Sequence, residues 1–302
     1  MESTALNIAV TGAVVAGVDG STGSDDAARW AALHAALENR RLVLVQAVPE
    51  RVTTYWPTSA AVDVLALRTA LHEDAKMGLK ALKERLEDEH EGLDVETYDV
   101  FGDPRDVLVD VSRHASLTVV GSRGRGSMRR ALMGSTSVTL SRHAHGPILV
   151  VRPDSKLPAH RGVVVGLDAD ERSEAAVEFA FDLASFHRAP LTVVHSTWDA
   201  VAFASDQGYV PPAPPSDEET ELMVSEATAG LREKYPDVEV HVRAAYGLPE
   251  NELLKLSEGA DLLVVGTRGR GTLAELLVGS TTTAVVEHAK CAVAVVPGTA
   301  SA

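Results

Sequence analysis

Two clusters of glycine and hydroxyl residues are the parts of this sequence best suited to chemistry. In the first cluster, Gly121, Gly124 and Gly126 follow a predicted strand, and Gly134 with Ser135 opens a predicted helix. Glycines let the backbone turn sharply and approach an anion, and free N–H groups in the turn and at the helix start then point at its oxygens. The second cluster has the same spacing at Gly266, Gly269, Gly271, Gly279 and Ser280. We therefore predict two phosphate-binding loops.

An aspartate closes the first predicted strand of each half of the chain, Asp19 and Asp168. Such an aspartate is commonly a helix cap or turn former, and the functional alternative is a hydrogen bond to a ribose hydroxyl. In a doubly wound sheet with strand order 3-2-1-4-5, the ligand crevice opens where the winding reverses, between strands 1 and 4. Strand 1 ends at Asp19 and strand 4 ends at Gly121. We expect the carboxylate and the glycine loop to face one crevice.

The two clusters belong to a duplicated segment of chain. Residues 119–151 align without a gap with 264–296, at an offset of 145 residues, whereas 14–31 aligns with 163–180 at an offset of 149. An internal repeat of this length predicts tandem domains.

We place the two domains at residues 1–155 and 160–302, around a linker at 152–161 that is rich in proline and charge. Short, nearly continuous apolar runs predict strands that helices cover on both faces. The strands predicted in the two copies are 14–18, 42–48, 94–101, 117–120 and 148–151, then 163–167, 191–195, 239–244, 261–265 and 292–296. The helical patterns of the first copy are 25–39, 61–89, 104–114 and 135–143. We predict an α/β chain of two doubly wound, Rossmann-like domains, each a five-stranded parallel sheet of order 3-2-1-4-5.

The overall charge restricts the partners. The chain has 43 acidic and 28 basic residues and a net charge of −15, so we expect no nucleic-acid partner. No apolar run approaches the roughly 20 residues that span a bilayer, so we expect no membrane partner. Residues 1–10 lack the basic start of a signal peptide, and the single cysteine, Cys291, cannot form an internal disulfide. We expect a cytoplasmic protein.

Catalytic and metal-binding motifs are not evident. The sequence has no G-x-x-x-x-G-K-[ST] loop, no G-x-G-x-x-G after the first strand, and no nucleophile elbow. His143 and His145 have no matching pair in the second copy. We predict no catalytic residue and no metal ligand.

The spacing of glycine, two residues, glycine, nine residues, glycine and serine or threonine resembles the ATP-binding signature of the universal stress protein family. It occurs here as Gly121, Gly124, Gly134–Ser135 and as Gly266, Gly269, Gly279–Ser280. The run GVDGS after the first strand and the run SRHAHGPILVVRP ending the first copy are also similar. The resemblance covers nearly the whole chain, as a tandem two-domain member of the kind abundant in mycobacteria and other actinobacteria. It implies adenine-nucleotide binding, a homodimer formed through the last strand, and a role in stress response or dormancy.

The resemblance also implies roles for individual residues. Asp19 and Asp168 would contact ribose, and backbone groups around Val48 and Thr197 would meet adenine, with Asp199 nearby. The other implied ligand contacts of the first copy are Gly17, Gly121, Ser122, Arg123, Gly124, Arg125, Gly126, Ser127, Gly134, Ser135 and Thr136. Those of the second copy are Gly166, Gly266, Thr267, Arg268, Gly269, Arg270, Gly271, Thr272, Gly279, Ser280 and Thr281.

The two predicted sites differ in charge. The arginines of the first loop are Arg123, Arg125, Arg129 and Arg130. The second loop keeps Arg268 and Arg270 but has Glu275 in place of the last arginine, and Asp170 follows its first strand. A like charge near a triphosphate costs about 1 kcal/mol when solvent screens it. We predict that the second site binds ATP more weakly.

These observations favour a regulatory protein that binds ATP, with or without Mg²⁺, and that is not a dedicated enzyme; the sequence does not name its regulatory partner protein. The alternatives are a weak ATPase, a cyclic-AMP-binding protein, and an interaction scaffold whose sites stay empty.

Overall fold

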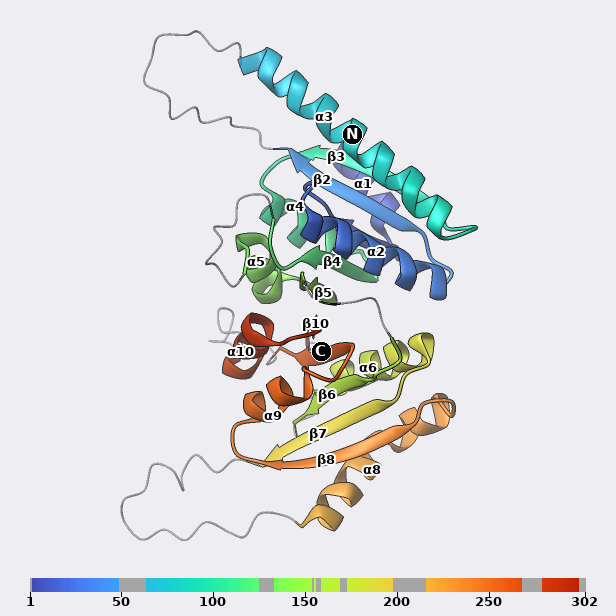
Figure 1. The fold of residues 1–302 in the computed structure, drawn as a ribbon, viewed down its shortest axis with the longest axis vertical. Helices are drawn as coiled ribbons and strands as arrows, with labels where there is room; N and C mark the ends of the chain where they lie inside the picture. The colour runs from blue at the N-terminus through green and yellow to red at the C-terminus, as the bar shows by residue number, and fades with distance from the viewer. Residues whose placement is uncertain are drawn as a thin grey trace, which may run out of the picture. The chain divides into compact units, whose positions relative to one another are not determined.

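The chain divides after Pro153 into two compact units (Figure 1). The computed structural model describes residues 2–48, 64–124, 133–153, 155, 159–168, 173–197, 216–267 and 279–298. Each unit is an α/β domain with a parallel sheet, as predicted. No helix in these ranges is both long enough and apolar enough to span a bilayer.

The first unit has five parallel strands in the order β3-β2-β1-β4-β5, which confirms the predicted order. These strands are β1 (Val14–Gly17), β2 (Leu42–Val48), β3 (Val95–Phe101), β4 (Leu117–Gly121) and β5 (Ile148–Val151). Every residue of β5 and the first four of β2 and β4 are buried, because helices cover both faces of the sheet. The carboxyl ends of β1 and β4 therefore lie side by side at the point where the winding reverses.

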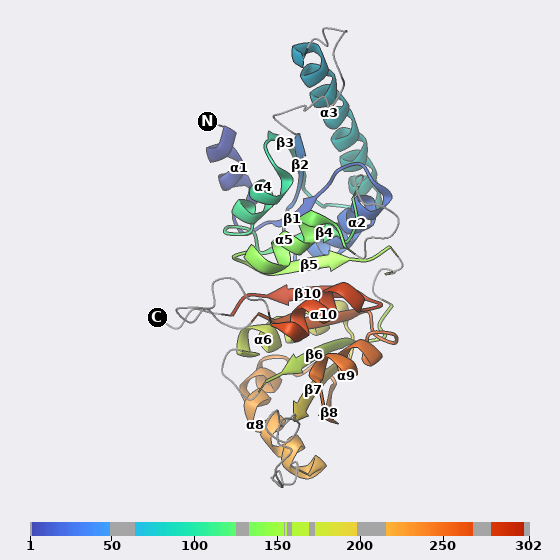
Figure 2. The same cartoon turned by 90° about the vertical axis from the view of Figure 1, so that its left-hand side faces the viewer.

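The helices of the first unit form two layers. They are α1 (Glu2–Val10), α2 (Thr22–Leu37), α3 (Val64–Glu89), α4 (Pro104–Val111) and α5 (Ser135–His143). One layer, α2 and α3, packs on one face of the sheet, and α1, α4 and α5 cover the other face (Figure 2). The N-terminal helix α1 is not among the predicted helices; Leu6, Ala9 and Val10 on it are buried.

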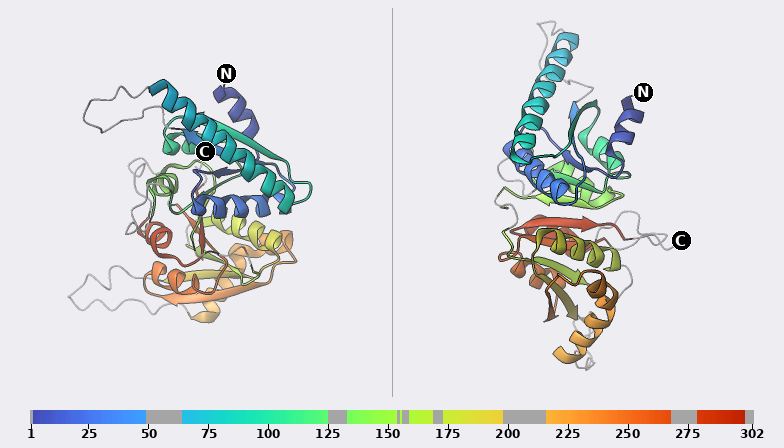
Figure 3. Two further views of the ribbon diagram at one scale, coloured as in Figure 1. Left: turned by 45° about the horizontal axis from the view of Figure 1, so that its top comes forward. Right: turned by 90° about the vertical axis from the view of Figure 1, so that its right-hand side faces the viewer.

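The second unit repeats this plan. Its strands are β6 (Val163–Leu167), β7 (Leu191–Thr197), β8 (Val240–Tyr246), β9 (Leu262–Gly266) and β10 (Ala292–Val296). They pair in parallel in the order β8-β7-β6-β9-β10. Its helices are α6 (Glu174–His187), α8 (Asp217–Lys234), α9 (Pro249–Leu256) and α10 (Ser280–His288). The pair α6 and α8 covers one face, and α9 and α10 cover the other (Figure 3).

Side chains decide where two of the helices begin. The hydroxyl of Ser21 accepts a hydrogen bond from the N–H of Ser24 at 3.3 Å, so α2 begins at Thr22, three residues earlier than predicted. The carboxylate of Asp103 caps α4 in the same way, accepting from the N–H of Arg105 at 2.9 Å. Pro104 fits the first position of α4, where no N–H donor is needed.

Candidate functional site

A tight turn fixes the carboxylate of Asp19 at the carboxyl end of β1. Its Oδ1 atom accepts hydrogen bonds from the N–H of Ser21 at 3.0 Å and from the hydroxyl of Ser21 at 2.6 Å. The N–H of Asp19 donates to the hydroxyl of Ser24 at 3.3 Å. Asp19 is thus a turn former, as the first interpretation of this residue holds, and the same turn keeps its carboxylate at the head of the sheet.

The glycine loop after β4 lies against this carboxylate. A Cβ atom added to Gly124 would contact Oδ2 of Asp19, so only glycine leaves the space between them open. Gly121 approaches the β1–α2 turn as closely, because a Cβ there would lie 2.6 Å from the carbonyl oxygen of Gly23. The structure therefore brings the aspartate and the glycine loop together on one crevice, in the arrangement that the sequence predicts.

The start of α5 supplies donors to the same crevice. Its N-cap is Gly134, which offers no side chain to accept from the first turn. The first N–H of this helix to donate to a helix carbonyl is that of Val138, which bonds the oxygen of Gly134 at 3.1 Å. The N–H groups of the residues between, Ser135 to Ser137, are the terminal donors that a helix cannot satisfy itself. Such donors, with the positive end of the helix dipole, suit an anion.

A cavity of about 530 Å³ lies between these elements. Its lining comes from the ends of β1, β2 and β4, from the loop after β4 and from the starts of α4 and α5. The lining residues are Gly17, Val18, Asp19, Ser24, Val45, Ala47, Pro104, Leu108, Val120, Gly121, Arg123, Gly124, Met133, Gly134, Ser135, Thr136 and Ser137. Arg123 adds positive charge to this lining. Volume and polarity are those of a small-ligand site.

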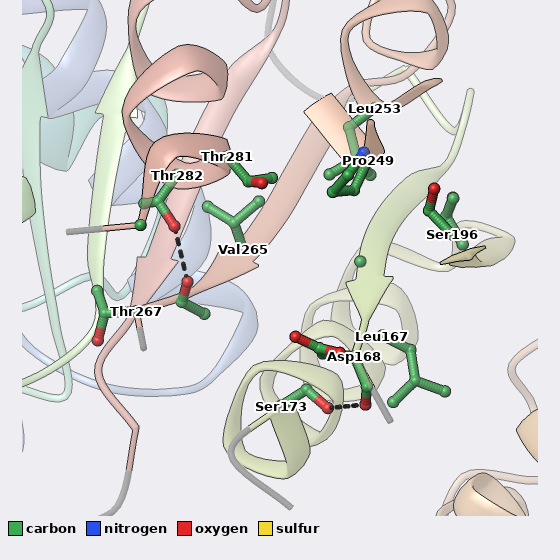
Figure 4. A pocket seen from close by; sticks show the side chains of 14 residues that line it. Leu167, Asp168, Ser173, Ser196, Pro249, Leu253, Val265, Thr267, Thr281 and Thr282 are labelled. Carbon is green, nitrogen blue, oxygen red and sulfur yellow. Dashed lines mark hydrogen bonds between the residues drawn. The ribbon is translucent and has the colours of Figure 1, made fainter. Parts of the chain in front are cut away.

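The second unit has an equivalent cavity of about 370 Å³. Figure 4 shows Thr281 and Thr282 from the first turn of α10 on one side, and Asp168 and Ser173 from the β6–α6 junction on another. The hydroxyl of Thr282 donates to the carbonyl oxygen of Gly266 at 2.8 Å, and the hydroxyl of Ser173 donates to that of Asp168 at 2.9 Å. The lining residues are Gly166, Leu167, Asp168, Ser173, Val194, Ser196, Pro249, Leu253, Val265, Gly266, Thr267, Gly279, Thr281 and Thr282.

Most predicted ligand residues that the structure describes line one of these cavities. The exceptions are Val48, Ser122, Thr197 and Ser280. The carbonyl oxygens of Val48 and Thr197 accept hydrogen bonds from Gly102 at 3.0 Å and Gly247 at 3.1 Å, so both belong to strand pairing. The predicted residues that lie outside the described part are Arg125, Gly126, Ser127, Asp199, Arg268, Gly269, Arg270, Gly271 and Thr272. So do the charged residues used to compare the two sites, Arg129, Arg130, Asp170 and Glu275.

The cavities also contain residues that the sequence analysis does not select. In the first unit those on β2 and α4 are Val45, Ala47, Pro104 and Leu108, and the others are Val18, Ser24, Val120, Met133 and Ser137. In the second unit those on β7 and α9 are Val194, Ser196, Pro249 and Leu253, and the others are Leu167, Ser173, Val265 and Thr282. Two periodicities could have found the residues on β2, α4, β7 and α9: alternate strand residues share a face, and helix residues four apart do the same.

The pair Asp103 and Arg105 lies beside the first cavity, at the start of α4. The Arg105 Nε donates to Asp103 Oδ1 at 2.8 Å. This hydrogen bond lowers the pKa of Asp103 to about 2. Partial burial of the carboxyl raises the pKa, and the hydrogen bond from the backbone N–H of Arg105 lowers it further. Both side chains are therefore charged at neutral pH.

The residues present fit a nucleotide better than a metal ion alone. The cradle at Gly124 leaves space that a Cβ would fill, and the first turn of α5 has donors for anionic oxygens. Among the described residues, no group of three or more His, Cys, Asp or Glu side chains is placed to hold a metal.

The fold and its two cavities define a class: tandem α/β proteins whose ligand crevice is formed by a glycine loop after strand 4 and the start of the next helix. The model of the universal stress protein family matches residues 12–152 and again residues 160–297. The chain belongs to the universal stress protein family.

Several known proteins are similar to this chain over all or part of its length. A universal stress protein of Mycobacterium tuberculosis is 37% identical over 289 residues, which cover 93% of this chain and 96% of the relative. A universal stress protein from Archaeoglobus fulgidus has a similar crystal structure, with a TM-score of 0.70, 20% identity, and coverage of 94% of this chain and 98% of its own. A universal stress protein solved in complex with cAMP matches 47% of this chain and 97% of its own, at 28% identity and a TM-score of 0.37.

Proposed function

We propose that this chain is a regulatory protein of the stress response whose two cavities bind adenine nucleotides, with residues 1–155 and 160–302 as the two binding domains. In the first cavity we propose ATP, with or without Mg²⁺. The observation that carries the proposal is the approach of Gly124 to Asp19 beside the terminal donors of α5. It supports a ribose against the carboxylate and phosphates over the glycine loop and the helix start.

The adenine ring has an apolar place in this arrangement. Val45 and Ala47 of β2, with Pro104 and Leu108 of α4, contribute apolar side chains to the lining. Flat aromatic rings bind well between such side chains when a few polar groups fix their orientation. A contact of adenine with backbone groups near Val48 and Thr197, beyond this lining, stays a prediction.

The hydrogen bonds of the Asp19 carboxylate favour a binding role over catalysis. Phosphoryl transfer needs a group that orients the attacking water, as well as electrostatic stabilisation of the phosphate. Asp19 is the carboxylate in the described lining of the first cavity, and its Oδ1 already accepts two hydrogen bonds from Ser21. If Mg²⁺ accompanies the nucleotide, the phosphates would supply most of its ligands.

Mass spectrometry of nucleotide released from the denatured protein, followed by calorimetric titration with ATP, tests the proposal. Gly124→Glu places bulk and negative charge in the first cradle, and we expect it to abolish binding there. The matched control is Gly78→Glu, since Gly78 is exposed on α3 with nothing within 4 Å of an added Cβ. The proposal is wrong if both variants bind ATP like the wild type, or if the wild type binds no adenine nucleotide. Phosphate release that rises in proportion to ATP binding would show that the protein is an ATPase. Displacement of bound ATP by a lower concentration of cyclic AMP would show that cyclic AMP is the preferred ligand.

We also propose a cytoplasmic homodimer. Cys291 is the single cysteine of the chain and can form no internal disulfide, which is consistent with a reducing compartment. Analytical ultracentrifugation at several protein concentrations tests the dimer.

A further inference from the structure

One hydroxyl group that lines the second cavity, that of Thr281, is hydrogen-bonded to a carboxylate, that of Glu250. Thr281, in the first turn of α10, lines this cavity, and its Oγ1 donates a hydrogen bond to Oε2 of Glu250 at 3.1 Å. Glu250 is the second residue of α9 and follows Pro249, which also lines the cavity. The proton of Thr281 is thus directed at the protein, and a half-buried negative charge lies next to the place where phosphates would go.

The first cavity has the same threonine but a different charge at the two equivalent positions. At the offset of 145 residues, Thr136 corresponds to Thr281 and Arg105 corresponds to Glu250. In the described part of the first unit, no carboxylate accepts a hydrogen bond from Thr136, which lines the cavity. The residue at the start of the neighbouring helix is here a cation, paired with Asp103. The second unit thus has a carboxylate where the first has a guanidinium.

A glutamate in the first turn of a helix needs no ligand to explain it, because the helix dipole favours negative charge there. The hydrogen bond from Thr281 is the additional observation. It joins the carboxylate to the first turn of α10, whose terminal N–H groups would hold phosphate oxygens. Each further phosphate adds negative charge close to Glu250, and repulsion between partly buried charges is screened less than between exposed ones.

We propose that the second cavity is selective for adenosine and its monophosphate, and that Glu250 is the residue that rejects the triphosphate. This inference depends on the proposed function, since it assumes that the cavity binds the adenine nucleoside. It assigns different ligands to two sites of one chain: the triphosphate to the first cavity and the forms with fewer phosphates to the second.

Titration of the full-length chain with adenosine, AMP, ADP and ATP tests this inference, with Gly124→Glu present to silence the first cavity. We expect the affinity of the second cavity to fall as phosphates are added, with ATP at least about tenfold weaker than AMP. Glu250→Gln keeps an oxygen acceptor for Thr281 but removes the charge. We expect it to raise the affinity for ATP about tenfold while the affinity for adenosine stays the same.

One further variant tests the same charge effect in the other unit. Arg105→Glu creates the second site's charge in the first unit, and in a chain with Gly124 intact it should weaken ATP about tenfold at the first cavity.

Three outcomes would overturn the inference. If the ratio of the affinities for ATP and adenosine is the same in Glu250→Gln as in the wild type, Glu250 does not select against the triphosphate, and the proposed function is unaffected. A loss of Mg·ATP affinity in Glu250→Gln, seen with Mg²⁺ and not with a chelator, would show that this carboxylate helps to hold the metal instead. Failure of every adenine compound, adenosine included, to bind the second cavity would overturn the proposed function of that cavity together with the inference.

Discussion

Gly124 lies so close to Asp19 that a Cβ at position 124 would contact the Oδ2 atom of this aspartate. The two residues are about a hundred positions apart in sequence and meet because β1 and β4 are neighbours in the sheet. The atom that a substituent at position 124 would displace, Oδ2 of Asp19, is at the end of a side chain. A small substituent there would therefore alter the ligand space more than the fold.

We therefore expect Gly124→Ala to reduce ATP affinity at the first cavity about tenfold, with little change in thermal stability. The methyl group would displace the carboxylate that we assign to the ribose. Calorimetry and a thermal unfolding curve on the same samples measure both effects. Gly78→Ala is the matched control: it fills open space on α3 and should add up to about 1 kcal/mol of stability without changing affinity. Unchanged affinity in Gly124→Ala would argue against the proposed ribose position.

Gly121 is expected to behave differently, because its neighbours are backbone atoms. A Cβ at this position would lie 2.6 Å from the carbonyl oxygen of Gly23 and 3.2 Å from the nitrogen of Ser24. Gly121→Ala must push the β1–α2 turn aside, and we expect it to lower the free energy of unfolding by about 1–3 kcal/mol. Urea denaturation measures the cost. Gly259→Ala, where the nearest atom is 4.0 Å away, should be close to neutral, and equal costs for the two variants would contradict the explanation.

Asp103 provides a pH-dependent prediction. Its hydrogen bonds with Arg105 lower its pKa to about 2, below the roughly 3.9 of an unfolded aspartate. A lowered pKa in the folded state contributes stability that is complete above about pH 4 and is lost as the pH falls through about 2. Asparagine also caps helices, so Asp103→Asn removes the charge and keeps the cap. The stability difference between wild type and Asp103→Asn should shrink from pH 5 to pH 2; a constant difference would rule out the charge. Asp103→Ala should cost about 1 kcal/mol at neutral pH.

Asp261 closes the turn that leads into β6. Its side chain is 3% exposed, and it accepts hydrogen bonds from the backbone N–H of Arg161 at 2.6 Å and from the Nε of Arg161 at 3.0 Å. Asp261→Ala leaves a backbone donor without its acceptor and should cost about 1–3 kcal/mol. Arg161→Gln removes only the exposed half of the pair and should cost less than about 1 kcal/mol. Urea denaturation measures the loss of unfolding free energy in both variants. A larger loss in Arg161→Gln than in Asp261→Ala would show that the ion pair, rather than the backbone hydrogen bond, provides the stabilisation.

The strands could be predicted from the sequence because a parallel sheet covered on both faces requires nearly continuous apolar runs. The strands 42–48 and 148–151 have the bounds that the sequence predicts. The helix α1 could not be predicted as easily, since it has nine residues and is stabilised by buried packing of residues such as Leu6 rather than by a strong local signal.

The candidate site divides in the same way. The approach of Gly124 to Asp19 and of Gly121 to the β1–α2 turn follows from spacing and topology, both of which are present in the sequence. The lining by Leu108 and Ala47 depends on which face of α4 and of β2 is turned toward the crevice, and only packing decides that. The hydrogen bond between Thr281 and Glu250 joins two helices that are neighbours only after folding.

The strand glycines beneath the two cavities differ in the room around them. A methyl group at Gly17 would lie 2.6 Å from Cδ1 of Leu108, whereas one at Gly166 would lie 3.4 Å from the nearest methyl carbon of Leu253. Gly17→Ala therefore forces a buried leucine to move, while Gly166→Ala makes only a tight contact. We expect the floor of the second cavity to accept an added methyl group with less rearrangement than the floor of the first. Engineering of a new ligand preference through the floor should therefore start more easily in the second copy.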